Sequence, residues 1–369
     1  MRKFLIRFCV FLLPCIVFLS IPLYILIITG EKFKNIDSVV NDNEKYLIGY
    51  AYDERSYGYL KYLEITKSKY KVIALGSSRV LQFRNQMFTT SFYNAGYTIQ
   101  VIEDFIPFLE NIPSSKTPKY LIIGLDQCMF NEFWNSDFSI SDKNKWQHSF
   151  YKYPTFGTIM KIWKDVIDGK IQFHADNSIK RIGVNAVMNN TGFRNDGSMY
   201  YGGQIDKLIR NDSSANDYLF NDTFDRIYKG NRRFEYGNAI DVKTISQIHE
   251  LLQYCKKRNI KLIAFLPPFA DSVFSKMINS GKYDYIKEIY ANLKPVFDEF
   301  GFELYDFSSA SSCASNDNEM IDGFHGGEAT YIKMLIKMLE GNSILSEIVD
   351  KPQLEQEFKK RNNNFIIYE

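Results

Sequence analysis

A serine in the first third of the chain and an aspartate–histidine pair near its end are the side chains best suited to do chemistry. Ser78 lies in the motif GSSR at residues 76–79, directly after the apolar run KVIAL. Asp322 and His325 lie in the motif DGFH, and the chain has only four histidines. This spacing lets the carboxylate accept a hydrogen bond from Nδ1 of the imidazole, which leaves Nε2 to take a proton from a serine hydroxyl. The three residues therefore predict a catalytic triad.

Taken separately, each motif also has a purely structural explanation. Ser77 or Ser78 could be an ordinary helix N-cap, and His325 could be a loop histidine in a local turn with Asp322. A serine that opens a helix after a strand nevertheless places its hydroxyl near backbone N–H groups and the positive end of the helix dipole, which favour an oxyanion. The catalytic interpretation therefore requires a fold that brings the two ends of the chain together.

The elements that must position these residues alternate in type along the chain. Short apolar runs, which are typical of strands, cover residues 71–75, 91–94, 120–125, 261–266 and 302–307, and helical spacing covers 99–112, 242–257, 284–300 and 328–339. This alternation predicts an α/β fold with a parallel sheet covered on both faces. Ligands bind such sheets at the carboxyl ends of the strands, so the residues after each run are the candidates for a site.

Four blocks in this order resemble the SGNH, or GDSL-like, hydrolases over roughly residues 70–340. The blocks are GSS at 76–78, Gly96 within NAG, GLD at 124–126 and DGFH at 322–325. The resemblance implies a flavodoxin-like three-layer α/β/α fold with a central parallel sheet, and a serine esterase or O-acyltransferase that forms an acyl-serine. It implies Ser78 as nucleophile, His325 as base and Asp322 as its orienting partner. It also implies that the backbone N–H groups of Ser78 and Gly96 form the oxyanion hole.

The third block departs from the family pattern, because Asp126 stands where the family has an asparagine that donates to the oxyanion. An ionised carboxylate only accepts hydrogen bonds and would repel an oxyanion. Arg79 could supply the missing donor if it pairs with Asp126, Gln127 could supply it instead, or the site could have lost hydrolytic power. We expect the Arg79–Asp126 pair, because both residues follow adjacent strands of the predicted sheet.

An uncharged segment near the N-terminus predicts a membrane anchor. Residues 8–29 carry no charge and are long enough to cross the hydrocarbon core as a helix. Arg2, Lys3 and Arg7 precede this segment and Glu31 follows it, so the positive-inside rule places the N-terminus in the cytoplasm and the rest in the periplasm or outside the cell. A cleaved signal peptide is the alternative, but its apolar region would be shorter and followed by a small-residue cleavage site. We expect an uncleaved single-pass anchor over residues 1–30.

The remaining segments divide the chain further. Residues 31–68 are charged and tyrosine-rich and are expected to form a partly helical juxtamembrane segment, followed by the α/β domain over 69–345. The alternation stops between about 130 and 240, where we expect an insertion of loops and short helices that caps or borders the site. Residues 346–369 are highly charged and are expected to form a peripheral tail.

Composition argues against several functions. The formal net charge is only +2 and basic clusters are lacking, which is unlike a nucleic-acid-binding protein. The GSSR motif has neither the Walker pattern nor the glycine spacing of dinucleotide-binding proteins. The five cysteines lack the spacing of a zinc site, so we expect no metal and no cofactor. One disulfide among Cys128, Cys255 and Cys313 is left open.

The anchor and the GSSR block together suggest a substrate class. They resemble anchored SGNH-like proteins similar to alginate O-acetyltransferases and to the D-alanine transfer protein of teichoic acid synthesis. The resemblance implies an acetyl or similar group on a cell-envelope or secreted polysaccharide, and a membrane-bound O-acyltransferase as partner. The alternative is a non-catalytic glycan-binding or scaffold subunit of an acylation or polysaccharide export complex. The complete Ser, Asp and His set argues against that alternative, since a binding protein does not need all three.

Overall fold

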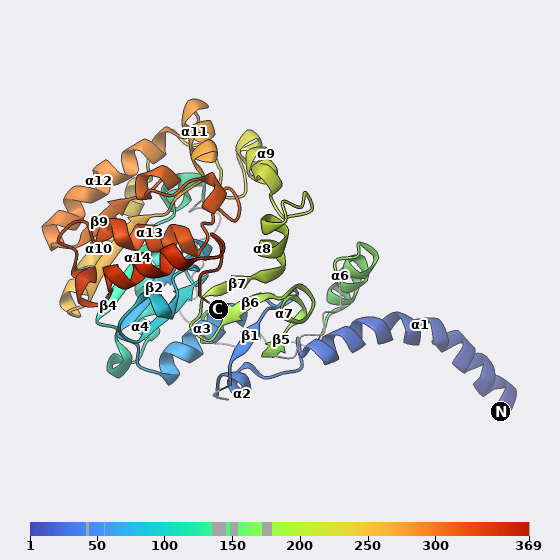
Figure 1. Cartoon of the computed structure of the whole chain (residues 1–369). Helices are drawn as coiled ribbons and strands as arrows, with labels where there is room; N and C mark the ends of the chain where they lie inside the picture. The colour runs from blue at the N-terminus through green and yellow to red at the C-terminus, as the bar shows by residue number, and fades with distance from the viewer. Residues whose placement is uncertain (42–43, 55, 135–144, 148–153, 172–178, 369) are drawn as a thin grey trace. The chain divides into compact units, whose positions relative to one another are not determined.

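The computed structural model describes residues 1–41, 44–54, 56–134, 145–147, 154–171 and 179–368 of the 369-residue chain (Figure 1). Two compact units are present. The smaller unit comprises residues 1–60, 149–195 and 199–203, and the larger comprises 61–148, 196–198 and 204–369. These boundaries differ from the predicted ones, because residues 31–60 of the expected juxtamembrane segment share one unit with part of the expected insertion.

The larger unit is built on a five-stranded sheet with the strand order β3-β2-β4-β8-β9. Every pair of neighbouring strands in it is parallel. The strands are β2 (Val72–Gly76), β3 (Phe92–Gly96), β4 (Tyr120–Gly124), β8 (Lys261–Leu266) and β9 (Glu303–Asp306). All five follow the apolar runs of the sequence to within a few residues, so the α/β prediction is confirmed.

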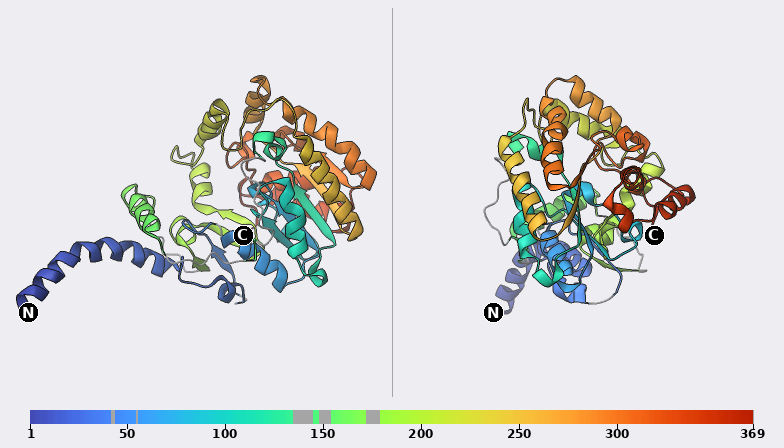
Figure 2. Two further views of the ribbon diagram at one scale, coloured as in Figure 1. Left: turned by 180° about the vertical axis from the view of Figure 1, so that it is seen from behind. Right: turned by 90° about the vertical axis from the view of Figure 1, so that its left-hand side faces the viewer.

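Helices cover both faces of this sheet, which explains why its strands are apolar throughout. On β2, Ile73 and Leu75 pack into one core cluster, whereas Val72 and Ala74 pack into a second cluster. The first cluster includes residues of α4 (Phe105–Asn111), α10 (Val242–Lys257) and α12 (Asp284–Phe300), and the second includes residues of α13 (Glu328–Met338) and α14 (Lys351–Lys360). The right-hand view of Figure 2 shows the sheet between these two layers.

The smaller unit contains a four-stranded mixed sheet of order β5-β1-β6-β7. Its strands are β1 (Tyr46–Ile48), β5 (Lys180–Ile182), β6 (Thr191–Arg194) and β7 (Met199–Tyr201). The expectation of only loops and short helices between 130 and 240 was therefore wrong. These strands have three or four residues each, too few for a recognisable period, and β1 finds its partners more than 130 residues further along the chain.

The expected anchor is a continuous helix, α1 (Arg2–Thr29). Within it, residues 6–29 are long and apolar enough to cross a membrane, judged by length and composition alone. Pro14 and Pro22 lie inside α1, and the helix follows a curved path in Figure 1. Helices α2 (Ile36–Asn41), α6 (Phe156–Ile167) and α7 (Val184–Asn189) also belong to the smaller unit.

The C-terminal segment is not the peripheral tail that its charge suggested. Leu354 and Tyr368 are buried. The buried carboxylate of Glu328 accepts hydrogen bonds from the backbone N–H groups of Ile367 and Tyr368, at 2.6 and 2.9 Å. Its other oxygen lies 2.6 Å from Nη1 of the buried Arg84. The last residues of the chain therefore satisfy a buried charge of the core, a role that composition does not reveal.

Candidate active site

Three glycines at the carboxyl ends of adjacent strands form a floor for the site. Gly76 and Gly96 are register partners in β2 and β3, and Gly124 ends the neighbouring strand β4. A Cβ atom at these positions would lie 2.9, 2.7 and 2.5 Å, respectively, from a methyl carbon of Val80. The glycines thus allow the turn after β2 to pack directly on the sheet edge. This close packing is a physical reason for the glycine in each of the first three sequence blocks.

Ser78 opens the turn that rests on this floor. The turn is the single 3₁₀ turn Ser78–Val80, capped by Ser77, whose hydroxyl accepts from the N–H of Arg79 at 3.1 Å. The helix that a serine after a strand could open is therefore a single turn in the structure. A three-residue turn has little macrodipole, so any stabilisation of an oxyanion must come from individual N–H groups and side chains.

The loop that carries His325 is fixed by contacts on both sides. The N–H of Ile321 donates to the carbonyl of His325 at 2.7 Å, which closes the loop on itself. The N–H of Gly323 donates to Oδ2 of Asp217 at 2.9 Å. A Cβ atom at Gly323 would lie 2.6 Å from Cγ2 of the buried Thr223. The glycine of the DGFH motif is therefore needed for close packing.

The structure brings the three predicted catalytic residues into one chain of hydrogen bonds. Nδ1 of His325 lies 2.7 Å from Oδ2 of Asp322, and Nε2 lies 2.8 Å from Oγ of Ser78. With the ring proton on Nδ1, the imidazole donates to the carboxylate and its Nε2 accepts from the serine hydroxyl. Oδ1 of Asp322 also accepts the backbone N–H groups of Phe324 and His325 at 2.9 and 2.8 Å. This geometry suits a nucleophile, a base and an orienting acid.

The electrostatics of Asp322 fit the orienting role. Burial on its own raises the pKa of this carboxyl, but the adjacent imidazole and the two backbone N–H donors outweigh burial, so the pKa lies below its ordinary value. The group therefore stays ionised at neutral pH. An ionised Asp322 can hold the Nδ1 proton of His325 and stabilise the imidazolium that forms when His325 accepts a proton.

Arg79 and Gln127 hold the backbone around the site in place. Their donors are engaged by other groups, so they do not replace the missing asparagine. Arg79 is buried and donates from Nε to the carbonyl of Phe324, from Nη1 to Oε1 of Gln127, and from Nη2 to the carbonyl of Pro267. The amide nitrogen of Gln127 donates to Pro267 and to Oγ of Ser308. These bonds tie the carboxyl ends of β2, β4 and β8 to the histidine loop. Burial lowers the pKa of Arg79.

Asp126 is paired with Arg233, and not with Arg79 as we expected. Oδ2 of this fully buried carboxylate lies 3.0 Å from Nη1 of Arg233 and accepts the hydroxyl of Ser77 at 2.6 Å. The other guanidinium nitrogen of Arg233 donates to Gln100, and the guanidinium lies 5.1 Å from the ring centre of Trp134. In the described part of the chain, Oδ1 of Asp126 has no hydrogen-bond partner.

Arg233 is the residue of the site that the sequence did not reveal. It lies in the stretch read as an insertion, more than 100 positions from Asp126. Its backbone has φ of 80°, in the left-handed region that residues other than glycine rarely adopt. Such strain persists where surrounding contacts over-determine it, and it is common at functional sites. Neither the spacing nor the composition around residue 233 carries a signal of this pairing.

The two backbone groups of the predicted oxyanion hole differ in their contacts. The N–H of Gly96 donates to Oδ1 of Asn94 at 2.9 Å, so it is already engaged. Asn94 lies two positions earlier on the same strand, and its amide nitrogen bonds to the carbonyls of Val80 and Phe83. The N–H of Ser78, at the first position of the turn, is the backbone donor that stays close to the reacting oxygen.

The thiols of the larger unit do not compete with Ser78 as nucleophiles. Cys128, Cys255 and Cys313 are buried and free, so none of them takes part in the disulfide that the sequence had left open. Burial raises the pKa of each thiol to about 12. A cysteine needs its thiolate to react, so these three side chains are inert near neutral pH.

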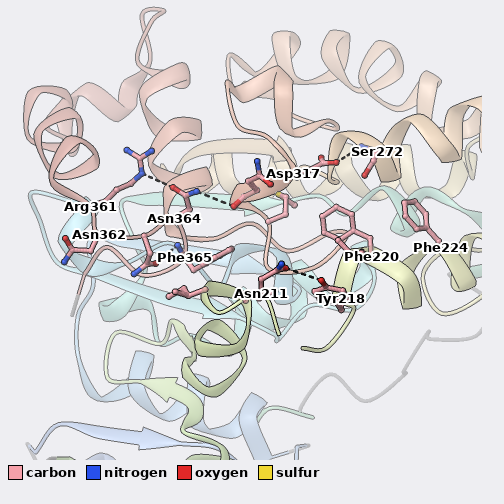
Figure 3. Close-up of a pocket in the computed structure, with 16 residues that line it drawn as sticks. Asn211, Tyr218, Phe220, Phe224, Ser272, Asp317, Arg361, Asn362, Asn364 and Phe365 are labelled. Carbon is pink, nitrogen blue, oxygen red and sulfur yellow. Dashed lines mark hydrogen bonds between the residues drawn. The ribbon is translucent and has the colours of Figure 1, made fainter. Parts of the chain in front are cut away.

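A cavity of about 900 Å³ lies next to the histidine loop (Figure 3). Ser78 and His325 are not among its lining residues. Asp317, Asn318 and Met320 form part of one wall and lead directly into that loop. Aromatic rings and amides are prominent in the lining, among them Tyr218, Phe220, Phe224, Phe365, Asn211 and Asn364. Phe220 has a left-handed backbone, with φ of 60°.

Comparison of the chain with models of known families gave no match, and neither did comparison with curated proteins. The class of protein must therefore be argued from the geometry of the site.

Proposed function

We propose that the chain is a serine esterase or O-acyltransferase of the SGNH type, with Ser78, His325 and Asp322 as its triad. The observation that carries the proposal is the continuous hydrogen-bonded chain from Asp322 through the imidazole to the hydroxyl of Ser78. Renumbered along the chain, the strands of the parallel sheet have the order 2-1-3-4-5, which is the flavodoxin-like order. The site lies at the carboxyl ends of these strands, which agrees with the proposal.

The reaction has two halves. Oγ of Ser78 attacks the carbonyl carbon of an ester while its proton passes to Nε2 of His325, and Asp322 stabilises the resulting imidazolium. The tetrahedral intermediate then collapses, the ester C–O bond breaks, and His325 returns the proton to the leaving alkoxide. Water or a sugar hydroxyl attacks the acyl-Ser78 in the second half, again with His325 as base, and releases the free serine. Hydrolysis and transfer differ only in this acceptor.

Arg233 supplies the donor that Asp126 cannot. The carboxylate of Asp126 holds the guanidinium next to Ser77, the neighbour of the nucleophile, and an arginine has five N–H donors. The charges of Asp126 and Arg233 cancel, so the pair is neutral overall, as an asparagine amide is. The pair nevertheless presents N–H groups where the family has that amide. Together with the N–H of Ser78, Arg233 would stabilise the negative charge of the intermediate.

A polysaccharide acceptor agrees with the chemistry of the cavity in Figure 3. Aromatic rings offer apolar faces for sugar rings, and amide side chains such as Asn211 and Asn364 offer donors and acceptors for hydroxyl groups. Residues 317–320 of the cavity wall directly precede the histidine loop. An acceptor bound at this wall would therefore lie beside the loop that carries the base. We propose an envelope or secreted polysaccharide as acceptor and a membrane-bound O-acyltransferase as the partner that supplies the acyl group.

We also propose that α1 anchors the protein with its N-terminus in the cytoplasm and the catalytic domain outside. Arg2, Lys3 and Arg7 lie in the seven positions before the uncharged residues 8–29, and Lys32 and Lys34 lie in the seven positions after them. Basic residues near a span tend to stay on the cytoplasmic side, so three before and two after favour a cytoplasmic N-terminus.

A non-catalytic scaffold is the second candidate, because Asp126 and the engaged N–H of Gly96 weaken the usual oxyanion hole. A fluorophosphonate probe, which phosphonylates only an activated serine, separates the two candidates. We expect labelling of the full-length protein in detergent, its loss in Ser78→Ala and its persistence in Ser77→Ala. A folded wild-type protein that takes up no probe would contradict the enzyme and support the scaffold.

A further inference from the structure

Helix α6 carries a stripe of exposed apolar side chains. Phe156, Met160 and Ile167 are 71%, 47% and 78% exposed. Together with Trp163 they follow the spacing i, i+4, i+7, i+11, which places all four on one face of a helix. The adjacent face of α6 is apolar too, because Ile162 is buried in a cluster with residues of α1. The helix thus packs on α1 through Ile162 and the ring of Trp163, and it leaves Phe156, Met160 and Ile167 exposed.

Trp163 makes a hydrogen bond that compensates for a proline in α1. The carbonyl of Phe18 would normally accept the N–H of residue 22 in an α-helix, but Pro22 has no N–H. Nε1 of Trp163 donates to this carbonyl at 2.9 Å. The two rings are also stacked, with 5.9 Å between their centres and 18° between their planes. A side chain of α6 therefore satisfies the backbone group that Pro22 leaves unpaired.

The position of this bond along α1 indicates where α6 lies. Phe18 is about 16 Å along the helix from Thr29, and the hydrocarbon core of a bilayer is about 30 Å thick. An unpaired carbonyl at that depth has no water to bind, and neighbouring helices commonly satisfy such groups. Helix α6 has 12 residues and is about 18 Å long, so it is too short to cross a bilayer itself.

The charged end of α6 lies beside the end of α1. The hydroxyl of Tyr52 donates to Asp165 at 2.8 Å, and the N–H of Tyr52 donates to Glu31, two residues after α1 ends. Lys170 pairs with Asp165 and Asp168 at 3.4 and 3.1 Å. The polar ends of the two helices thus lie together, and their apolar parts lie side by side.

We propose that α6 inserts into the same lipid bilayer as α1, in the leaflet near the C-terminal end of α1. Phe156, Met160 and Ile167 face the lipid acyl chains, the long side chains of Lys161 and Lys164 extend toward the headgroups, and Lys170 lies with its carboxylate partners at the polar end. The occupant of the uncovered face is lipid, because this face is continuous with the apolar surface of α1. The inference rests on α1 crossing the membrane, which is part of the proposed function, but not on acyl transfer.

Site-specific fluorescence tests the location of the stripe. We would introduce Met160→Cys, or Lys170→Cys at the polar end as the control, into full-length protein with Cys9→Ser and Cys15→Ser, leaving only buried thiols. Each variant is labelled with an environment-sensitive fluorophore and reconstituted into phosphatidylcholine vesicles. We expect doxyl groups on the acyl chains to quench the label at position 160 and aqueous iodide to quench the label at position 170. Equal quenching of both labels by iodide would overturn the proposal, as would protection of position 160 from both quenchers, which would mean that protein covers the stripe.

A double-variant experiment tests the role of Trp163. Trp163→Phe keeps the ring but removes the N–H, so we expect deuterium exchange in α6 to become several-fold faster. Pro22→Ala restores the N–H of residue 22, so Trp163→Phe should then have little effect. An equal effect in both backgrounds would contradict the compensation. Hydrolysis of p-nitrophenyl acetate should be unchanged in all these variants, so a failure here is distinguishable from a failure of the proposed enzyme.

Discussion

His325 and Ser78 lie 247 positions apart in the chain, yet Nε2 of the imidazole lies 2.8 Å from Oγ of the serine. Ser78 lies near the start of the larger unit's sequence and His325 lies near its end, and the two residues meet at one edge of the parallel sheet. An N-cap role for Ser78 or a local turn at His325 does not account for this contact, because the two side chains bond to each other across separate segments of the chain. The contact brings the GSSR and DGFH motifs together in one candidate site.

Replacement of the orienting acid should impair the chemical step. In Asp322→Asn the side chain no longer fixes the Nδ1 proton or stabilises an imidazolium, so kcat for p-nitrophenyl acetate should fall by roughly 10³–10⁴-fold. KM should change little, because Asp322 contacts His325 and not the ester. Asp298→Asn, at an exposed position of α12, is the matched control. A kcat for Asp322→Asn within about threefold of wild type would contradict a triad, because loss of the orienting acid costs far more than that in a working triad.

Asp322 should also make stability depend on pH in a defined direction. Its folded pKa is lowered, so its ionised form stabilises the fold above the ordinary aspartate value of about 3.9. This contribution is lost as the pH falls through the folded pKa. We expect wild type to exceed Asp322→Asn in urea-denaturation stability at pH 6, with the difference shrinking at pH values below about 4. A difference that grows with acidification would have the wrong sign.

Arg233 and Asp126 should behave as a unit. Arg233→Met removes the proposed oxyanion donor and should lower kcat by about 10²–10³-fold. It also leaves the buried carboxylate of Asp126 unpaired, which should cost about 3–5 kcal/mol of stability. Adding Asp126→Asn neutralises that carboxylate and restores the amide of the family pattern, so the double variant should be more stable and more active than Arg233→Met alone. Additive losses in both rate and stability would refute the coupling.

The glycine floor predicts a size-compensation experiment. A Cβ atom at Gly124 would lie 2.5 Å from Cγ1 of Val80, so Gly124→Ala should destabilise the larger unit by about 1–3 kcal/mol and shift the Ser78 turn. Val80→Ala removes the opposing methyl groups. The Gly124→Ala, Val80→Ala pair should therefore cost less than the sum of the single changes in chemical denaturation. Strict additivity would show that the two positions do not press on one another.

The buried C-terminus should contribute to stability. Glu328 binds Arg84 and two backbone N–H groups of the last residues, so Glu328→Ala should lower the free energy of unfolding by about 3–5 kcal/mol. Glu340→Ala is the control, because Glu340 is exposed and its contact with Lys337 lies on the surface. Equal stability of the two variants would mean that the C-terminal segment does not support the core.

The sequence predicted those parts of the fold that have a strong local pattern. The buried strands 72–76 and 261–266 are continuously apolar because helices cover both of their faces, and α10 and α12 have clear helical spacing. The strands of the smaller unit escaped prediction because they are three or four residues long and because β1 pairs with strands more than 130 positions away. The same limit applied to the tail, where Tyr368 is buried by contacts with Arg84 and Glu328.

The candidate site shows the same division. Ser78, Asp322 and His325 were predictable because each has a recognisable position relative to a strand. The pairing of Asp126 was not, because Arg233 lies in an irregular segment and reaches the site from a left-handed backbone. Arg79 follows the expected strand, yet burial directs its donors to the carbonyls of Phe324 and Pro267 and to Gln127. Spacing identifies residues near a sheet edge, but it does not identify which charges meet there.

The central claim is that Ser78 becomes covalently acylated. Its most direct test is to mix the full-length protein with p-nitrophenyl acetate, quench with acid during turnover, and locate the acetyl group by peptide mass spectrometry. We predict an acetyl ester on Ser78 in the wild-type protein, with p-nitrophenol released in step, and neither signal in Ser78→Ala. Ester hydrolysis with an unmodified Ser78 peptide, or acetyl groups found only on lysines or on Ser77, would contradict the account.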